Sequence, residues 1–330
     1  MVLKSLRFFE RFEELTGGRT ASFVRTGYLL GVDDRLRREM EAAVALQQSQ
    51  GINVRLVSPT ELGELEPRLS TEDLVAGCYE PDSGYADPSQ TTQGFAGAAR
   101  DLGVRITEQT EVLGVLTCGD RVAGVKTSKG EIDAPIVVNA AGTWGDRIGR
   151  MAGLEIPITV CRHKINFIAW PEDARRPHPL VYDFVTNIYT RPETGGLILV
   201  GLLDSEEVND RADPDGYQEG VAFDETLDAL SRAARRFPVL ERGSVAKGYA
   251  GCFDVTPDWH PILDKAGPEG FYVAVGFSGH GFKLSPAVGE MMAELITEGP
   301  RHGSDVSAFR LSRFAEGKPI RGTYGDWLMC

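Results

Sequence analysis

The sequence predicts a protein of mixed helices and strands, in which an antiparallel sheet is inserted between two parts of another domain. Residues 157–203 are rich in strand-forming residues and have few helix signals, whereas helical and strand-like segments alternate on either side of them. The chain has 330 residues, of which 42% are hydrophobic, enough for two domains or one large α/β unit. We therefore expect functional residues at an interface between parts of the molecule.

Composition narrows the classes of partner. The 35 lysines and arginines face 48 acidic residues, and a net charge of −13 repels phosphate backbones, so we expect no nucleic-acid partner. No stretch approaches the roughly 18 apolar residues of a membrane helix, and the first residues lack the order of a signal peptide, which predicts a cytoplasmic protein without a membrane span. The five cysteines and five histidines show no ligand spacing, so we expect no metal site.

The first part of the chain is predicted to alternate between helices and strands. Apolar residues recur at helical spacing before two glycines, which predicts an amphipathic helix with a glycine stop. The predicted elements are this helix over 2–16, a strand over 22–32, a helix from Asp33 to Gln50, a strand over 53–57 and a short helix over 58–66.

The next part begins with a helix start signal. Asp87 stands before Pro88, a capping residue followed by a favoured first helical residue, and predicts a helix to Leu102. From Val104 to Asn139, β-branched residues separated by turn-forming residues predict three strands. Small residues then allow close backbone approach before a helix that ends near residue 153.

The C-terminal region combines strand, glycine-rich turn and helix. The predicted elements are a helix over 224–236, a strand over 270–276, a turn over 277–283, a helix over about 285–297 and a loosely held tail from Glu316.

Three segments carry chemical signals. The strongest is the turn from Gly276 to Lys283, because glycines let backbone N–H groups face a ligand and a helix start favours negative charge. A tight strand-to-helix connection without a ligand is the alternative. Residues 137–144 deliver small residues and a tryptophan to one turn, where close packing is the alternative. Residues 256–261 predict a rigid turn that bears an aromatic residue, with plain loop architecture as the alternative, and for His260 a structural role is favoured over a catalytic one.

Together these segments resemble the D-amino-acid-oxidase-like superfamily of FAD-dependent oxidoreductases, in particular its sarcosine oxidase and dimethylglycine dehydrogenase branch. The resemblance covers nearly the whole chain, to about Phe314. The matching segments are Gly84–Pro88, Val137–Trp144, Asp254–Pro261 and Gly270–Pro286.

The resemblance implies an α+β fold of two domains. One is an α/β domain of the FAD/NAD(P)-binding type, truncated at its N-terminus, and the other is a substrate domain built on an antiparallel sheet. The implied boundaries are 1–32, 84–156 and 245–315 for the split FAD-binding domain, 33–83 and 157–244 for the substrate domain, and 316–330 for a tail.

The resemblance also implies site residues. Val112 would meet the adenine through its backbone, and Ala140, Ala141, Gly142 and Trp144 would lie against FAD. Gly279, His280, Gly281, Phe282 and Lys283 would wrap the flavin ring.

Two sets of residues are implied to contact the substrate. Lys283 would hold the substrate carboxylate over the flavin, a contact that positions rather than reacts; a solvated or phosphate-neutralising lysine is the alternative. Tyr182, Tyr189 and Phe253 are candidates for the pocket wall, with core packing as the alternative.

The implied function is FAD-dependent oxidation of a C–N bond in a small secondary or tertiary amino acid, such as sarcosine or dimethylglycine, by hydride transfer to flavin. The substrate partner is a small amino acid or amine, and a separate electron-acceptor protein is a candidate partner. The first helix resembles the one that follows the G-x-G-x-x-G unit of the family, and that unit is absent from the sequence. The alternatives are a catalytically inactive fragment or pseudoenzyme that cannot retain FAD, and a start placed too far downstream.

Two further departures refine this expectation. Cys252 lies one place from the position that matches the flavin-linking cysteine of monomeric sarcosine oxidases, so it would point away and FAD would be non-covalent. Leu197–Val200 is wholly apolar where those oxidases keep an oxygen-activating lysine. The sequence therefore favours a dehydrogenase over an oxidase.

Overall fold

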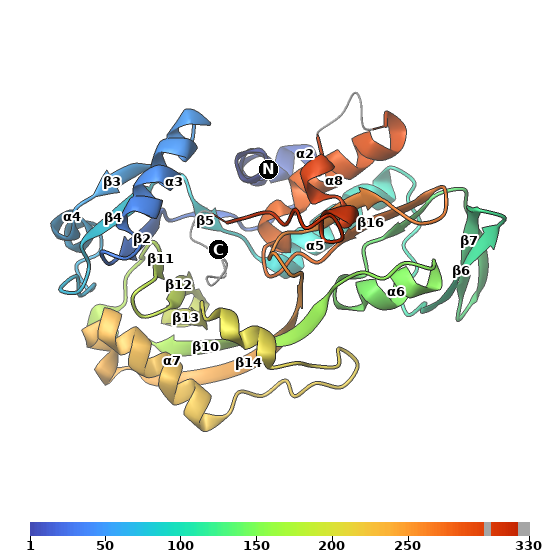
Figure 1. Ribbon diagram of the computed structural model, residues 1–330. Helices are drawn as coiled ribbons and strands as arrows, with labels where there is room; N and C mark the ends of the chain where they lie inside the picture. The colour runs from blue at the N-terminus through green and yellow to red at the C-terminus, as the bar shows by residue number, and fades with distance from the viewer. Residues whose placement is uncertain (300–304, 323–330) are drawn as a thin grey trace.

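One half of the molecule is built on a large mixed sheet. A computed structural model describes residues 1–299 and 305–322. Within these residues the large sheet has eight strands in the order β14-β10-β13-β12-β11-β2-β4-β3 (Figure 1). They are β2 (Tyr28–Val32), β3 (Arg55–Val57), β4 (Ala76–Glu80), β10 (Thr159–Ala169), β11 (Leu180–Asp183), β12 (Ile188–Glu193), β13 (Leu197–Leu202) and β14 (Ser244–Val255).

Most neighbouring strands of the large sheet are antiparallel. The longest pairing joins β10 to β14, from Thr159 opposite Val255 to Ala169 opposite Ser244. The parallel pair is β11 with β2. Mixed helices and sheets, with antiparallel pairing over the strand-rich central segment, confirm the predicted fold class.

Two helices cover opposite faces of the large sheet. α7 (Phe223–Arg236) packs its buried alanines against the face that carries Val200. α3 (Arg37–Ser49) packs Met40 against Leu30 on the other face, near β2 and β4. α3 covers only the end of this sheet face that lies near β2 and β4. The rest of the same sheet face carries the aromatic side chains of β10, β11, β12 and β14.

The other half of the molecule combines small sheets with helices, and most of it lies on the right side of Figure 1. Within the described residues its sheets are β15-β16-β9, β6-β7-β8 and the ribbon β1-β5. The strands are β1 (Val24–Arg25), β5 (Gly84–Tyr85), β6 (Val112–Cys118), β7 (Arg121–Thr127), β8 (Gly130–Asp133), β9 (Val137–Asn139), β15 (Ile262–Lys265) and β16 (Phe271–Val275). The helices are α1 (Val2–Glu10), α2 (Phe12–Leu15), α5 (Pro88–Asp101), α6 (Gly145–Met151) and α8 (Gly281–Thr297), while α4 (Pro59–Leu65) packs beside β3.

The large sheet takes strands from outside the predicted substrate domain. β2 lies in the range 1–32 and most of β14 in the range 245–315, yet both pair with strands of the central segment. The pairing satisfies backbone groups that would otherwise lie unbonded at the sheet edges. The domain boundaries themselves stay a prediction.

α8 begins earlier and β6 later than the sequence predicts. α8 begins at Gly281 although Pro286 lies within it. A proline cannot donate to the carbonyl four residues before it, and here the Ser285 hydroxyl donates to that carbonyl, at Phe282, over 3.0 Å. This local replacement lets the helix start directly after the glycine-rich turn. The strand expected from Val104 begins only at Val112.

A buried ion pair fixes the turn after β14 to the C-terminal segment. Arg313 donates from Nε and Nη2 to the two carboxylate oxygens of Asp258, each over 2.8 Å, and from Nη2 to the His260 carbonyl. The Ile320 N–H donates to Asp258 over 2.9 Å, so the predicted tail is held at this residue, while 323–330 lie outside the described residues. Burial opposes ionisation of Asp258, but the hydrogen bonds from Arg313 and Ile320 outweigh it and lower the pKa of Asp258.

Replacing Arg313 with methionine leaves Asp258 buried without its cation, so we expect a loss of about 3–5 kcal/mol in unfolding free energy near neutral pH. A carboxyl with a lowered pKa stabilises the fold above its unfolded pKa, and this contribution disappears as the pH falls through the folded pKa. The deficit of the variant relative to wild type should therefore shrink with acidification. Urea unfolding at several pH values measures it. Arg242→Met, which removes an exposed ion pair, is the control and should unfold like wild type; equal effects of the two variants would contradict the prediction.

Candidate functional site

Two turns rich in small residues meet at one edge of the β15-β16-β9 sheet. β16 and β9 are parallel, with Phe271 opposite Val137 and Val273 opposite Asn139. Because the carboxyl ends of parallel strands lie at the same edge, the turn that starts at Ala140 and the turn that starts at Gly276 lie side by side. Such an edge is where ligands bind in open α/β sheets.

The turn between β16 and α8, residues 276–280, is held in an unusual backbone conformation. Gly276, Ser278 and Gly279 have φ values of 72°, 51° and 85°. The Asp254 carboxylate accepts a hydrogen bond from the Gly276 N–H over 2.7 Å, and the Asp254 carbonyl accepts one from the Ser278 N–H over 3.2 Å. Burial, only partly offset by these backbone donors, raises the pKa of Asp254. The end of β14 thus positions this turn.

The start of α8 offers backbone donors. Its N-cap is His280, and among the described residues no side chain caps the helix. The N–H groups of Gly281 and Phe282 have no acceptor within the helix, because the first N–H groups of a helix never do. Together with the helix dipole they favour a ligand atom that carries negative charge.

The second turn leaves room beside its small residues. Ala140 is exposed, Ala141 donates its N–H to the Asn139 side chain over 3.2 Å, and a Cβ on Gly142 would meet nothing within 4 Å. The Trp144 indole N–H donates to Asp215 over 2.7 Å, which ties this turn to the loop after β13, and the expected contact of Trp144 with a cofactor stays a prediction.

An aromatic face of the large sheet leads towards the glycine-rich turn. The ring centroids of Tyr28 and Tyr182 are 5.2 Å apart, and those of Tyr182 and Tyr189 are 5.4 Å apart. At the other end of the row, a Cβ on Gly279 would come within 2.6 Å of the Phe253 ring. The structure therefore brings the predicted wall residues Tyr182, Tyr189 and Phe253 onto one face.

His163 connects the two ends of this aromatic row, and it lies in none of the sequence motifs that predict site residues. Its ring stacks on Phe253 with centroids 4.3 Å apart and on Tyr189 with centroids 5.9 Å apart. Its Nδ1 lies 2.6 Å from Glu207 and its Nε2 lies 2.8 Å from the Tyr189 hydroxyl. The available sequence signal was a histidine on the same strand face as Ile165 and Phe167.

Other predicted site residues are more dispersed. Phe282 packs against Phe9 of α1, with ring centroids 5.6 Å apart. Val112 begins β6 and pairs with Thr127 in a separate sheet. Lys283 is exposed in the first turn of α8, and burial followed by the charge of Lys283 lowers the pKa of His280 to about 3, so that this imidazole is neutral at physiological pH. The roles of these residues stay predictions.

The two segments that differ from the sarcosine oxidases, Cys252 and Leu197–Val200, lie in β14 and β13. Cys252 pairs with Arg162 and alternates with Phe253 along β14, so its side chain points to the opposite face of the sheet. Ile198 and Val200 are fully buried in β13. Lys164 of β10 is held by Asp210 at 2.7 Å and by Glu225 at 3.2 Å.

The arrangement can bind a flat, polar molecule. Backbone donors at the start of α8 can hold an electron-rich edge, the open space beside Gly142 admits close approach, and the aromatic face supplies an apolar wall. Among the described residues, no helix has the length and apolar character to cross a membrane. The same residues contain no group of three or more His, Cys, Asp or Glu side chains placed to hold a metal ion.

Comparison with known proteins places this geometry in a family. The chain is 30% identical over 313 residues to the mitochondrial sarcosine dehydrogenase of Mus musculus. The aligned region covers 92% of this chain and 34% of that protein. It is 26% identical over 310 residues to the mitochondrial dimethylglycine dehydrogenase of Rattus norvegicus, with 89% of this chain and 36% of that protein covered. The chain thus spans about a third of the length of these curated relatives.

A solved structure is similar over most of the chain. The crystal structure of L-proline dehydrogenase from P. horikoshii superposes with a TM-score of 0.87 and 30% identity, covering 97% of this chain and 83% of that chain. The family described as FAD dependent oxidoreductase, or DAO, matches residues 1–295. These findings confirm the resemblance drawn from the sequence motifs, and the chain belongs to the DAO family of FAD-dependent oxidoreductases.

Proposed function

We propose that this protein uses FAD to oxidise the C–N bond of a small secondary or tertiary amino acid. The observation that carries the proposal is the uncapped start of α8, which directly follows a turn fixed against the aromatic face of the large sheet. Family membership supplies the class of cofactor, and sarcosine, dimethylglycine and proline dehydrogenases among the similar proteins support the class of substrate.

The residues present fit a flavin ring. A Cβ on Gly279 would clash with the Phe253 ring. Because glycine has no Cβ, the backbone of the turn can lie directly against the aromatic face. The Gly281 and Phe282 amides would hold a carbonyl edge of the ring, and Ala140 to Gly142 would admit the cofactor at the neighbouring strand end. With Cys252 on the opposite face, we propose non-covalent binding.

The side chains around this position would bind and orient the amino acid. When bound, FAD accepts the hydride from the carbon next to nitrogen, which amino-acid side chains cannot do. Lys283 would hold the substrate carboxylate by a charge-assisted contact, and Tyr182, Tyr189 and Phe253 would exclude water from the amine. Water would hydrolyse the resulting imine after release.

The electron acceptor is proposed to be a carrier rather than oxygen. Reduction of oxygen develops negative charge that a fixed cation stabilises. Leu197–Val200 supply none, and Lys164 is engaged by two carboxylates on the face opposite to His163.

Anaerobic mixing of FAD-loaded protein with sarcosine, dimethylglycine or L-proline should bleach the visible absorbance of the oxidised flavin, because the flavin accepts the hydride. The matching amines without a carboxylate should not, because Lys283 would have no partner. A protein that retains FAD but is reduced by none of these acids contradicts the proposed substrate class. A protein that retains no FAD supports the alternative of an inactive family member.

Replacing Lys283 with methionine should raise the KM for the amino acid by about 10-fold or more while flavin content stays at the wild-type level, because one charge-assisted contact is lost from substrate binding. Steady-state kinetics and flavin absorbance after gel filtration measure the two quantities. Lys265→Met, on the exposed side of β15, is the matched control and should leave both unchanged. An unaltered KM in Lys283→Met would remove this residue from the substrate site.

With one amine substrate, we expect an artificial dye to be reduced at least about 10-fold faster than peroxide forms in air-saturated buffer, because the flavin position lacks a fixed cation at β13. The two rates are measured on the same preparation. Equal rates would assign the protein to the oxidases.

A further inference from the structure

A cavity of about 630 Å³ lies on the face of the large sheet opposite to the aromatic row. Lys164 and Asn166 of β10 line it, and both side chains point away from the aromatic face because strand residues alternate between faces. Leu202 of β13 lines it as well, whereas its neighbour Gly201 lies beneath the Tyr189 ring on the other face. The cavity is therefore separate from the position proposed for the substrate.

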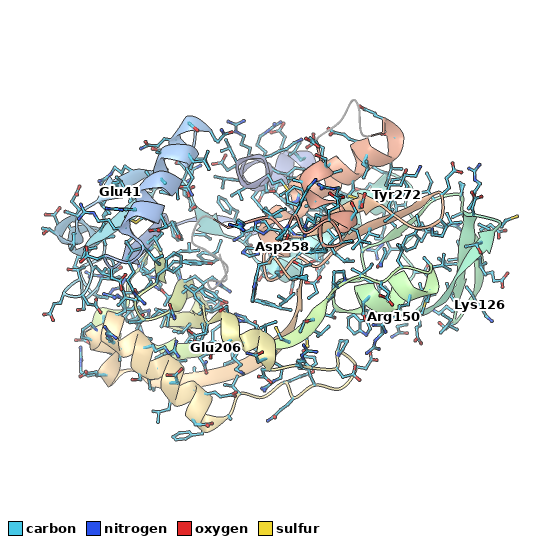
Figure 2. All side chains as sticks on the ribbon, in the orientation of Figure 1. Glu41, Lys126, Arg150, Glu206, Asp258 and Tyr272 are labelled. Atoms are coloured by element: carbon cyan, nitrogen blue, oxygen red, sulfur yellow. The ribbon has the colours of Figure 1, made fainter. Side chains whose placement is uncertain are left out.

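α7 and the 3₁₀ turn Ser205–Asn209, which follows β13, complete the wall of this cavity. The lining residues of α7 are Glu225, Asp228 and Arg232, which recur three and four positions apart and so share one face of the helix. Glu206, labelled in Figure 2, is exposed on the 3₁₀ turn. The carboxylates of the wall are those of Asp204, Glu206, Glu207, Asp210, Glu225 and Asp228.

The cations of the wall do not balance these carboxylates. Lys164 is held by Asp210 at 2.7 Å and by Glu225 at 3.2 Å, and Arg232 is held by two further carboxylates at 2.7 and 3.0 Å. Burial opposes the charge of Lys164, but its hydrogen bonds to the carboxylates outweigh burial and raise the pKa of Lys164. Six carboxylates against two cations leave four negative charges in excess. The cavity therefore favours a ligand that brings positive charge.

Two buried oxygen atoms of the lining residues have no hydrogen-bond donor in the described part of the chain. One is Oδ1 of Asn166, whose side chain faces the cavity from β10 and which is only 2% exposed. The other is Oε1 of Glu207, on the 3₁₀ turn. A buried acceptor without a donor is unfavourable, and such groups mark places where a further molecule binds. A ligand with N–H groups would supply the donors that these two oxygens lack.

The size and the walls of the cavity select among cations. Its volume is in the range of small-molecule sites and far exceeds that of a single ammonium group. The carboxylates stand on separate elements, and the described residues contain no group of three or more His, Cys, Asp or Glu side chains placed to hold a metal ion. A flexible aliphatic chain with an ammonium at each end can reach carboxylates on both α7 and the 3₁₀ turn, while its methylene groups contact Leu202.

We propose that this cavity is a binding site for an aliphatic polyamine, a molecule in which short methylene chains separate two or more ammonium groups. One ammonium donates to the unpaired oxygens of Asn166 and Glu207, and another lies among the carboxylates of Glu206 and α7. Binding is non-covalent and needs neither flavin nor turnover. The inference therefore goes beyond the proposed amine oxidation and is independent of it.

The first test compares amines by isothermal titration calorimetry of the full chain at low ionic strength. Spermidine should bind at one saturable site, and added salt should weaken it because the attraction is electrostatic. Putrescine has two ammonium groups on a four-carbon chain, and butylamine has one on a chain of the same length. We expect butylamine to bind at least about 10-fold more weakly than putrescine, since it engages only one end of the site.

The second test uses three variants. Asn166→Leu removes an unpaired oxygen at similar side-chain size, so spermidine affinity should fall by about 10-fold or more, while the midpoint of thermal unfolding stays at the wild-type value or rises. Glu206→Gln removes one charge from an exposed side chain and should weaken spermidine by about 3-fold. Glu64→Gln makes the same change on an exposed residue of α4, outside the cavity, and should bind spermidine like wild type.

Three results would overturn the polyamine site. The first is a titration that does not saturate and that Glu206→Gln and Glu64→Gln weaken equally, because this is general attraction to an acidic surface. The second is equal affinity for butylamine and putrescine. The third is displacement of spermidine by Mg²⁺ at matched ionic strength, which would assign the cavity to an inorganic cation. Because these titrations need no flavin, a protein that oxidises no amine would still decide the inference.

Discussion

The antiparallel pairing of β10 with β14 is the constraint on which the site depends. These strands pair from Thr159 and Val255 at one end to Ala169 and Ser244 at the other, and they join the large sheet to the half of the molecule that carries the glycine-rich turn. Asp254, near the end of β14, holds the glycine-rich turn through the Gly276 N–H. Arg313 binds Asp258 and so holds the segment that directly follows β14. Because paired residues share a face, one register places Phe253 beneath Gly279 and His163 beside Phe253. A slip of one residue in β14 would turn the Phe253 side chain to the sheet face opposite to His163.

The site therefore combines two kinds of order. The turn before α8 owes its shape to backbone conformations and to a buried carboxylate, whereas the aromatic face owes its shape to strand register. Each part is incomplete alone: uncapped amides bind many anions, and a row of tyrosines is an ordinary packed surface. Their contact at Gly279 and Phe253 brings backbone donors next to aromatic side chains, and this is where we propose that a flat cofactor and an amine bind.

Local signals predicted much of this structure. The Asp87 side chain accepts a hydrogen bond from the Gln90 N–H over 2.7 Å, and α5 begins at Pro88 as the capping pattern predicts. The glycine-rich turn was also identified from sequence, because its conformation is local. Glu207 and His163 were not, since their contact joins residues 44 positions apart and requires the 3₁₀ turn to fold back over β10. The start of α8 was missed because a serine hydroxyl, rather than a proline N–H, bonds the Phe282 carbonyl.

The contact between Gly201 and Tyr189 limits which substitutions this protein can accept during evolution. Any larger residue at 201 collides with the Tyr189 ring, so selection that keeps the ring also keeps the glycine. Glycine weakens a strand interior, and the tyrosine that lies over it restores packing that the glycine gives up. The two positions are thus coupled by side-chain volume. Tyr189 must be replaced by a smaller residue before Gly201 can be replaced by a larger one. Lineages that abandon the tyrosine should lose the glycine soon afterwards, and the pair should covary among related sequences.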